Sequence, residues 1–249
     1  MRLKDQVAIV TGAASGFGAE IARRYVAEGA KVAVADINEE GAKAIAASLG
    51  SSAIAVRCDV SKRADINSLV TTTVKHFGTL DVVVNNAGFT HKNSSMLDVD
   101  EETFDRMFDI NVKSIYLMTQ AVVPILRAKK RGCIINVGSV SGMRPRPGLV
   151  WYAASKAAVN LMSKAMAVEL GPDNIRVNAL APVMAPTGLI SAFMGMPDTP
   201  ENRAKFTANI PLGRLGTPAD VAKAAVYLAS DDADFITGVE LPVDGGRAV

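Results

Sequence analysis

Residues 11–18 read TGAASGFG and follow directly on the apolar run VAIV at residues 7–10. The three glycines of this stretch come before residues 19–28, whose apolar positions have helical spacing. In a strand–loop–helix unit, glycines let the backbone approach a pyrophosphate closely, and the start of the helix offers free N–H groups and a positive dipole. The stretch therefore predicts either a phosphate-binding loop or an ordinary turn.

Asp36 helps to decide between these two interpretations. It ends a strand-like run at residues 31–36, about twenty residues beyond the glycines. An acid at this place would accept hydrogen bonds from both hydroxyls of an adenosine ribose. The two features together favour a dinucleotide site over a turn followed by an unrelated, exposed aspartate.

Strand-like and helix-like patterns alternate along the rest of the chain. The apolar, strand-like runs lie at residues 7–10, 31–36, 53–58, 80–84, 133–137, 175–180 and 239–243. The helix-like stretches lie at 19–28, 39–49, 61–77, 100–128, 150–170 and 218–229, with Ser61 and Thr217 as N-caps and an interruption at Pro124. The pattern predicts a seven-stranded parallel sheet with helices on both faces, in one doubly wound, Rossmann-type α/β domain over residues 1–249.

Residues 183–210 lie outside this alternation. They contain Met184, Phe193, Met194, Met196 and Phe206 among prolines and polar residues. The segment follows the predicted sixth strand, at the edge where open parallel sheets bind ligands. We therefore expect a lid over the substrate in preference to a surface loop packed on itself.

The composition argues against several classes of protein. The chain has 27 Lys and Arg against 25 Asp and Glu, and its one basic cluster, residues 129–131, comes where a helix is expected to end. No basic stripe suits nucleic acid, and no apolar run is long enough for a membrane span or a signal peptide. Cys58 and Cys133 are interpreted as buried thiols of a cytoplasmic protein. His76 and His91 lack cysteines or acids at ligand spacing, so no metal site is predicted.

The spacing of the glycines is G-x-x-x-G-x-G, and together with Thr11 it resembles the signature of the short-chain dehydrogenase/reductase family. Further motifs of that family follow in order along almost the whole chain. They are Asp59-Val60 after the third strand, Asn85-Asn86-Ala87-Gly88 after the fourth, and the ending Leu241-Pro242-Val243-Asp244-Gly245-Gly246. The resemblance implies a nicotinamide dinucleotide as the cofactor.

The resemblance also implies which residues form the site. The catalytic tetrad of the family is matched by Asn111, Ser139, Tyr152 and Lys156. Its cofactor-binding positions are matched by Gly12, Ser15, Gly16, Phe17, Gly18, Asp36, Asp59, Val60, Asn86, Ala87, Gly88, Tyr152, Lys156, Pro182 and Thr187. After the sixth strand the family commonly has Pro-Gly, whereas this chain has Pro182-Val183. Valine cannot take the positive φ open to glycine, so a different backbone is expected there.

Tyr152 and Lys156 lie four residues apart in a predicted helix, so their side chains share one face. An ammonium about 4 Å from a phenol would favour the phenolate by roughly 4 kcal/mol at an effective dielectric constant of about 20. This would bring the pKa of Tyr152 from about 10 towards about 7, where acid–base catalysis is efficient. Ser139 is expected to hydrogen-bond the substrate oxygen as charge builds there. In the family, Lys156 also holds the nicotinamide ribose, and Asn111 matches a residue of a water-linked proton relay.

The residues favour NAD over NADP. NADP-using relatives usually meet the 2′-phosphate with a basic residue just before the second glycine or just after the second strand. This chain has Ser15 at the first place and Asp36-Ile37-Asn38 at the second, so Asp36 would repel the phosphate. Arg144 and Arg146 follow Ser139 in a proline-broken segment. They are interpreted as solvent-exposed loop charges in preference to contacts with an acidic substrate.

The predicted function is an NAD(H)-dependent oxidoreductase that moves a hydride between nicotinamide and a secondary alcohol or ketone. One alternative is a 3-oxoacyl reductase acting on a carrier-protein or coenzyme A thioester, although residues 171–174 carry an acid where that branch has basic docking residues. An alternative of another class is a nucleotide-sensing or scaffold protein, which would have no reason to keep the Ser–Tyr–Lys set. The expected partners are a small-molecule substrate and, in a homotetramer, further copies of the chain.

Overall fold

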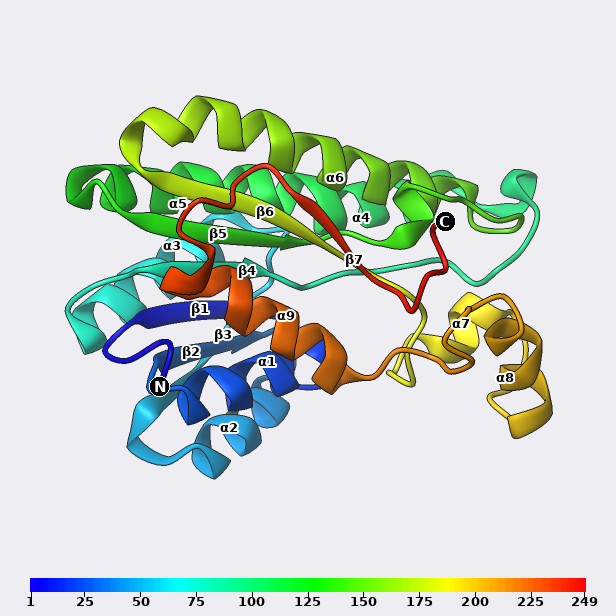
Figure 1. Cartoon of the computed structure of the whole chain (residues 1–249), viewed down its shortest axis with the longest axis horizontal. Coiled ribbons are helices and arrows are strands. Elements are labelled where there is room, and N and C mark those ends of the chain that lie inside the picture. Colours follow the sequence, from blue (N-terminus) through cyan, green and yellow to red (C-terminus); the bar gives the residue numbers. More distant parts are fainter.

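The computed structural model describes residues 1–249 and is built on one parallel sheet of seven strands. The strands are β1 (Val7–Thr11), β2 (Lys31–Asp36), β3 (Ala53–Arg57), β4 (Val82–Asn85), β5 (Gly132–Val137), β6 (Ile175–Pro182) and β7 (Glu240–Val243). Their order across the sheet is β3-β2-β1-β4-β5-β6-β7 (Figure 1). The order reverses between β1 and β4, which is the place where open parallel sheets bind ligands. The predicted fold class is confirmed.

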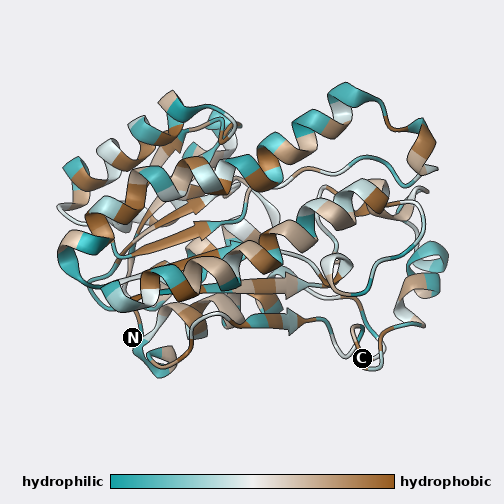
Figure 2. Cartoon of the chain, turned by 90° about the horizontal axis from the view of Figure 1, so that it is seen from above, coloured by the Kyte–Doolittle hydropathy of each residue, from teal (hydrophilic) through white to brown (hydrophobic).

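Helices cover both faces of the sheet. They are α1 (Gly16–Ala27), α2 (Glu39–Ser48), α3 (Arg63–Phe77), α4 (Glu101–Phe108), α5 (Ser114–Lys129), α6 (Val150–Leu170), α7 (Ile190–Met194), α8 (Pro200–Thr207) and α9 (Pro218–Ala229). Figure 1 shows α1, α2 and α9 on one face and α3, α5 and α6 on the other. Along β1, Ala8 and Val10 belong to the core under the first group and Ile9 to the core under the second. Strands buried on both faces must be apolar throughout, and Figure 2 shows this hydrophobic sheet between amphipathic helices.

The predicted helix over residues 100–128 is broken at a different place. The helix does not stop at Pro124, which lies inside α5, although a proline removes one backbone hydrogen bond. The break is a π-helical turn, Asp109–Lys113, between α4 and α5. Turns of this kind often occur at functional sites. Asn111 lies in the middle of this turn.

The two predicted N-caps have different outcomes. Thr217 caps α9 in a full capping box with Asp220, as predicted. Ser61 does not cap α3, because the helix begins only at Arg63 and Lys62 is its N-cap residue. The Ser61 hydroxyl donates to Asp59 Oδ1 at 2.7 Å instead.

Residues 183–210 contain the short helices α7 and α8, which project beyond the carboxyl ends of the strands (Figure 1). A small apolar cluster joins this segment to the sheet edge. Its buried members are Val140, Ala181, Val183, Ile190, Met194, Ile210 and Leu215. The segment is therefore a packed structure with its own core, at the edge that holds the site.

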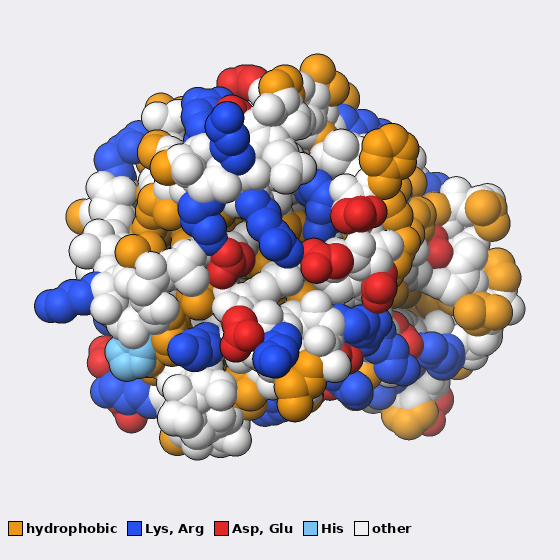
Figure 3. All heavy atoms as spheres, turned by 60° about the vertical axis from the view of Figure 1, so that its left-hand side comes forward, with side chains coloured by type: hydrophobic (Ala, Val, Ile, Leu, Met, Phe, Trp, Pro, Cys, Tyr) orange, Lys and Arg blue, Asp and Glu red, His pale blue; other side chains and the backbone are white.

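The surface carries mixed charge. On the face that Figure 3 shows, Lys and Arg side chains alternate with Asp and Glu. The basic cluster at the end of α5 is largely neutralised, since Lys129 pairs with Asp81 and Arg131 with Asp231. Cys58 and Cys133 are both buried and free. No helix has the length and apolar character needed to cross a membrane.

Candidate active site

The glycine loop between β1 and α1 has the shape of a phosphate cradle. Gly12 and Gly16 have φ of 62° and 56°, which glycine adopts readily. A Cβ on Gly18 would lie 2.3 Å from the Gly12 carbonyl oxygen, so no side chain fits there. Ser15 precedes α1 in an extended conformation, and its side chain caps no backbone N–H. The first turn of α1 thus keeps free N–H groups that could donate hydrogen bonds to a pyrophosphate. The residues present therefore fit a dinucleotide.

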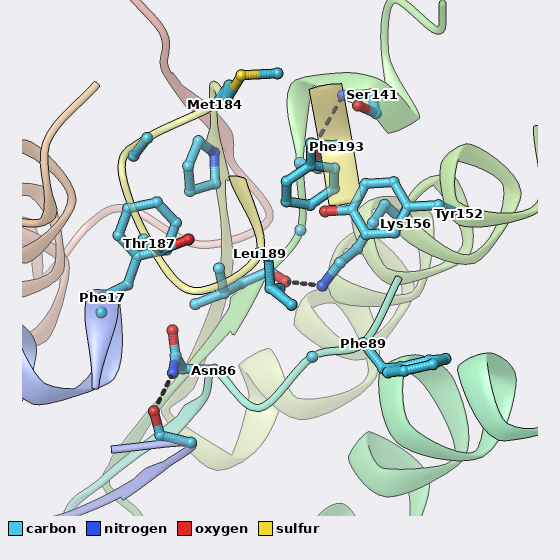
Figure 4. Close-up of a pocket in the computed structure, with 18 of the residues that line it drawn as sticks. Phe17, Asn86, Phe89, Ser141, Tyr152, Lys156, Met184, Thr187, Leu189 and Phe193 are labelled. Carbon is cyan, nitrogen blue, oxygen red and sulfur yellow. Dashed lines mark hydrogen bonds between the residues drawn. The ribbon is translucent and has the colours of Figure 1, made fainter. Parts of the chain in front are cut away.

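Asn86, after β4, holds this loop in place. Its amide nitrogen donates to the carbonyl oxygens of Thr11 at 2.8 Å and Gly12 at 3.1 Å (Figure 4). The hydroxyl of Thr11 accepts in return from the backbone N–H groups of Asn86 and Ala87, at 3.0 and 3.1 Å. The two motifs that the sequence singled out separately are therefore one hydrogen-bonded unit.

Asp36 lies at the end of β2, opposite the same loop. Its Oδ2 accepts from the N–H of Ala14 and its Oδ1 from the N–H of Asn38, both at 2.9 Å. Asp59 and Val60 line the cavity beside it, together with Ile37 and Cys58. Neither lysine nor arginine lines this end of the cavity, so its net charge is negative.

A cavity of about 520 Å³ runs from the glycine loop to the segment at residues 183–210. Every predicted cofactor-binding residue except Gly18 lines it, and so do three of the four predicted catalytic residues, Ser139, Tyr152 and Lys156. Gly18 and Asn111 lie behind its wall. The structure thus brings together at one sheet edge residues that are spread over most of the chain.

Tyr152 and Lys156 are both buried on α6, on the face turned to the sheet. The Lys156 ammonium donates to the Val137 carbonyl oxygen at 2.8 Å and lies 5.9 Å from the centre of the Tyr152 ring (Figure 4). Burial lowers the pKa of Lys156 to about 8. Burial also raises the pKa of Tyr152 to about 12, although the Ser139 hydroxyl and the charge of Arg146 both lower it. The predicted fall of the tyrosine pKa is wrong here, because desolvation of the phenolate outweighs these favourable groups.

Ser139 follows β5 and lies beside Tyr152. Its hydroxyl oxygen accepts from the N–H of Ser141 at 3.0 Å (Figure 4). The backbone of Ser139 is held from α6, where the Asn160 amide donates to the Ser139 carbonyl oxygen at 3.3 Å. A Cβ on Gly138 would lie 1.9 Å from Asn160 Oδ1, so a side chain there would displace the Asn160 amide. Sequence reasoning missed Asn160 and Gly138, although Asn160 stands one helical turn after Lys156.

Asn111 is buried in the π-helical turn and is fully hydrogen-bonded. Its amide donates to the Phe89 carbonyl oxygen at 2.9 Å and to Ser155 Oγ at 3.0 Å, and its Oδ1 accepts from the Phe89 N–H at 2.8 Å. A Cβ on Gly88 would lie 3.5 Å from Asn111 Oδ1 and 3.6 Å from Lys156 Nζ. Gly88 thus lies between the side chains of Asn111 and Lys156.

The segment after β6 closes the other side of the cavity. Val183 keeps an ordinary backbone conformation: its N–H donates to the Val243 carbonyl oxygen at 3.2 Å, which extends the pairing of β6 with β7. In place of the positive φ open to glycine, Val183 therefore continues the hydrogen bonding of β6 by one residue. Thr187 lies against the glycine loop, since a Cβ on Gly16 would meet its methyl group at 3.4 Å.

Residues from α7, from α8 and from the segment after Ser139 complete the cavity around Tyr152. The ring of Phe193, on α7, lies 5.0 Å from the Tyr152 ring in an edge-to-face arrangement. Arg146 is half-buried, lines the cavity and lies over the ring of Phe206 at 5.0 Å. Its interpretation as a solvated loop charge is therefore wrong. Arg144 is exposed, as expected, but lines the same cavity.

A doubly wound sheet whose switch point carries a dinucleotide cradle next to buried serine, tyrosine and lysine side chains defines an oxidoreductase of the Rossmann class. A family model described as enoyl-(acyl carrier protein) reductase matches residues 12–248. The chain belongs to the short-chain dehydrogenase/reductase family and is one of its oxidoreductases of hydroxyl and carbonyl groups.

Known relatives match over the full length of the chain. It is 49% identical to 4-formylbenzenesulfonate dehydrogenase of Comamonas testosteroni, covering 100% of both chains. It is 40% identical to 2,5-dichloro-2,5-cyclohexadiene-1,4-diol dehydrogenase of Sphingobium indicum, over 100% of this chain and 98% of the relative. A solved structure of 3-ketoacyl-(acyl-carrier-protein) reductase from Brucella melitensis, complexed with NADH, superimposes with a TM-score of 0.95 at 43% identity, covering 99% of this chain and 100% of that one.

Proposed function

We propose that this oxidoreductase uses NAD(H) to interconvert an alcohol and its carbonyl compound, with a secondary alcohol and ketone as the general case. The observation that carries the proposal is the cavity itself, in which Ser139, Tyr152 and Lys156 meet between the glycine cradle and the segment at residues 183–210. The relatives named for an aldehyde and for a diol, and the structural neighbour that holds NADH, support it.

The choice of NAD rests on the negative end of the cavity. Asp36 keeps lone pairs free on both carboxylate oxygens after its two backbone hydrogen bonds, so it can still accept from ribose hydroxyls. A 2′-phosphate would meet the charges of Asp36 and Asp59 and no cation. Gly12, Ser15, Gly16, Phe17 and Asn86 would hold the rest of the dinucleotide.

The chain's own residues would carry the proton chemistry. A bound nicotinamide would accept the hydride from the alcohol carbon, or return it to the carbonyl. Tyr152 would take the hydroxyl proton in oxidation and give it back in reduction, while Ser139 hydrogen-bonds the substrate oxygen. Lys156 would hold the nicotinamide ribose and stabilise the phenolate, and Asn111 would fix the Phe89 backbone on the route by which the proton reaches solvent.

The protonation of Tyr152 and Lys156 depends on the exclusion of water from the cavity. Tyr152 has a pKa of about 12 and Lys156 a pKa of about 8, because burial removes water from both side chains. Substrate and cofactor bring polar atoms next to these groups. We expect the phenolate of Tyr152 to be stabilised only when the cavity is filled, which confines acid–base chemistry to the complete complex.

We further propose that the whole chain works as one cytoplasmic domain, with residues 183–210 as its lid, and that it assembles as a homotetramer. Large apolar side chains support the assembly: Leu161 and Val168 on α6 are 69% and 81% exposed, and Tyr116 on α5 is 52% exposed. Helix faces of this kind are usually covered by a partner. Light scattering at micromolar concentration tests this, and a monomeric mass would contradict it.

A 3-oxoacyl thioester reductase is the second candidate, and the similarity to 3-ketoacyl-(acyl-carrier-protein) reductase favours it. The surface after α6 argues against a carrier protein, because Asp173 lies there and pairs with Arg127 at 2.6 Å. This pair leaves little free positive charge for an acidic carrier.

A screen of substrates distinguishes the two candidates. The purified protein is incubated with NADH or NAD and a panel of ketones, aldehydes and alcohols, and with acetoacetyl-coenzyme A, while NADH absorbance is followed. We expect turnover of small alcohols or carbonyls with NAD(H). Turnover of the thioester alone would favour the second candidate, and no turnover of any compound would contradict both.

A further inference from the structure

The two ends of the cavity carry opposite charge. The acidic residues that line it are Asp36 and Asp59, and both lie at the glycine-loop end. The end beyond Tyr152 is lined by four arginines, Arg106, Arg144, Arg146 and Arg247. The four come from α4, from the segment after Ser139 and from the last residues of the chain, so only the folded structure brings them to one place.

None of these arginines pairs with an aspartate or glutamate side chain. The ion pairs that involve Asp or Glu are formed by other residues. Arg144 donates to the main-chain oxygens of Arg247 and Val249, and Arg106 lies on the ring of Phe89. Arg144 thus has the oxygen of the last residue as its partner, whereas Arg106, Arg146 and Arg247 carry positive charge at the substrate end with no acidic side chain beside them.

Arg146 is the member of this group that lies nearest to the chemistry. Its guanidinium donates to the Phe193 carbonyl oxygen, and the Phe193 ring contacts that of Tyr152. A guanidinium has five N–H donors, so most of those on Arg146 remain for a ligand. Burial and the nearby Arg247 lower the pKa of Arg146, whereas Tyr152 raises it. A half-buried cation facing another cation is costly unless an anion joins them.

The walls between Tyr152 and Arg146 are aromatic and apolar. Phe193 contacts both residues, and Phe206 lies under the guanidinium. Met184 and Leu215 complete the lining on this side. A flat ring could pack edge-to-face or stacked against these phenylalanines, with its reacting carbon at Tyr152 and a substituent directed towards Arg146.

We propose that Arg146, supported by Arg247, is an anion-binding residue that selects the substrate, and that the substrate is a small aromatic alcohol or aldehyde bearing a carboxylate or sulfonate on its ring. The proposal rests on the proposed function, because it assumes that Tyr152 marks the reacting carbon. The planar guanidinium suits both acid groups, since it can donate two parallel hydrogen bonds to a pair of their oxygens.

Three probes that differ in charge test the proposal with NADH as the reductant: 4-formylbenzenesulfonate, 4-formylbenzoate and uncharged benzaldehyde. We expect the native enzyme to prefer the two acids in kcat/KM by at least about tenfold. Arg146→Gln should lose at least about thirtyfold with the acids and less than about threefold with benzaldehyde. Arg146→Lys should retain part of the preference, and Arg131→Gln, at a remote surface ion pair, should match the native enzyme.

Several outcomes overturn the proposal. A native preference for benzaldehyde would do so, and so would equal losses with all three probes in Arg146→Gln, which would show that Arg146 only supports the lid. Salt provides a second readout: the KM for the acids should rise with ionic strength, whereas that for benzaldehyde should not.

The proposal and the proposed function can fail separately. If neutral carbonyls are reduced but the acids are not preferred, only the anion site is wrong. If nothing is reduced, the proposed function is wrong. The anion site is then tested by calorimetry, which measures the binding of benzenesulfonate and of benzyl alcohol to the enzyme mixed with NADH. Binding of benzenesulfonate that Arg146→Gln abolishes would support the site, and no binding to the native protein would overturn it.

Discussion

The glycine-loop end of the cavity and its substrate end are built by different means. At the first end, main-chain groups and a few short side chains form the wall, and Asn86, Thr11 and Asp36 fix them by hydrogen bonds of 2.8–3.1 Å. At the second end, long side chains from α7, α8 and two loops form the wall. A wall of backbone tolerates few substitutions, whereas a wall of side chains can be changed residue by residue.

This difference matches the two ligands. A dinucleotide is the same in every catalytic cycle and in every relative that uses it, so a rigid cradle suits it. The substrate differs between relatives, as the names of an aldehyde and a diol dehydrogenase indicate. The catalytic residues lie at the boundary where the two ends meet.

The largest effect is expected from Tyr152→Phe, at the boundary itself. The substitution removes the group that exchanges a proton with the substrate, so kcat should fall by at least about a hundredfold. The dissociation constant of NADH, measured by fluorescence titration, should stay within about twofold, because the phenol acts on the substrate end. Tyr227→Phe, on α9, is the matched control. If Tyr152→Phe kept more than about a tenth of the rate, another group would be the acid.

Cofactor preference tests the charge of the glycine-loop end. The native enzyme should favour NAD over NADP by at least about a hundredfold in kcat/KM. Asp36→Ala should narrow the gap by at least about tenfold, by weakening NAD and relieving the repulsion of the 2′-phosphate. Asp36→Asn should act in the same direction while keeping one oxygen for Ala14 or Asn38. Equal efficiency of the native enzyme with both cofactors would show that Asp36 does not face the ribose.

Gly18→Ala tests whether the cradle is as closely packed as its distances indicate. The added Cβ would meet the Gly12 oxygen at 2.3 Å and Asn86 Nδ2 at 2.5 Å, so the loop must shift. We expect a loss of about 1–3 kcal/mol in the free energy of unfolding, and NADH binding weaker by at least about tenfold. Gly171→Ala, where nothing lies within 4 Å of the new Cβ, should change stability by less than about 0.5 kcal/mol. Similar stabilities for the two variants in urea denaturation would contradict the packing argument.

The smallest effect is a pH dependence that comes from Lys156. Its folded-state pKa of about 8 lies below the usual value of about 10.5, so between these values the unfolded chain binds more protons. Stability contributed by this residue therefore rises with pH in that window. Relative to Lys156→Met, the native chain should gain about 1 kcal/mol per pH unit between about pH 8 and 10. Lys75→Met, on the surface, should follow the native curve. Parallel curves for native protein and Lys156→Met would mean that the ammonium is not desolvated.

The sequence allowed the fold and the glycine-loop end to be predicted for a physical reason. Alternation of apolar strands and amphipathic helices is a local signal, and glycines with positive φ follow directly on β1. Asp36 is informative because its distance from the glycines is set by one helix and one strand. All of these features depend on residues that are close together in the chain, so the sequence alone indicates them.

The substrate end could not be predicted in this way. Arg146 is surrounded by Phe193 and Phe206, some 50 and 60 residues further along the chain, and only the packing of residues 183–210 brings them together. The pKa of Tyr152 could not be predicted from the sequence either. Helical spacing places Lys156 on the same face of the helix but says nothing of the desolvation of the phenol. Asn111 was expected inside a regular helix, and a change of hydrogen-bond spacing over five residues leaves no clear mark in composition.

That π-helical turn has a consequence for engineering. Each residue of an α-helix advances by about 100°, so deleting one residue within 109–113 would restore a continuous helix and rotate α4 against α5 by about that angle. The repaired helix would gain regular hydrogen bonds, yet Asn111 could no longer reach both Phe89 and Ser155. A library of single-residue deletions across this turn would therefore separate thermostability from turnover, since the irregularity that weakens the helix is what directs the Asn111 amide to Phe89 and Ser155.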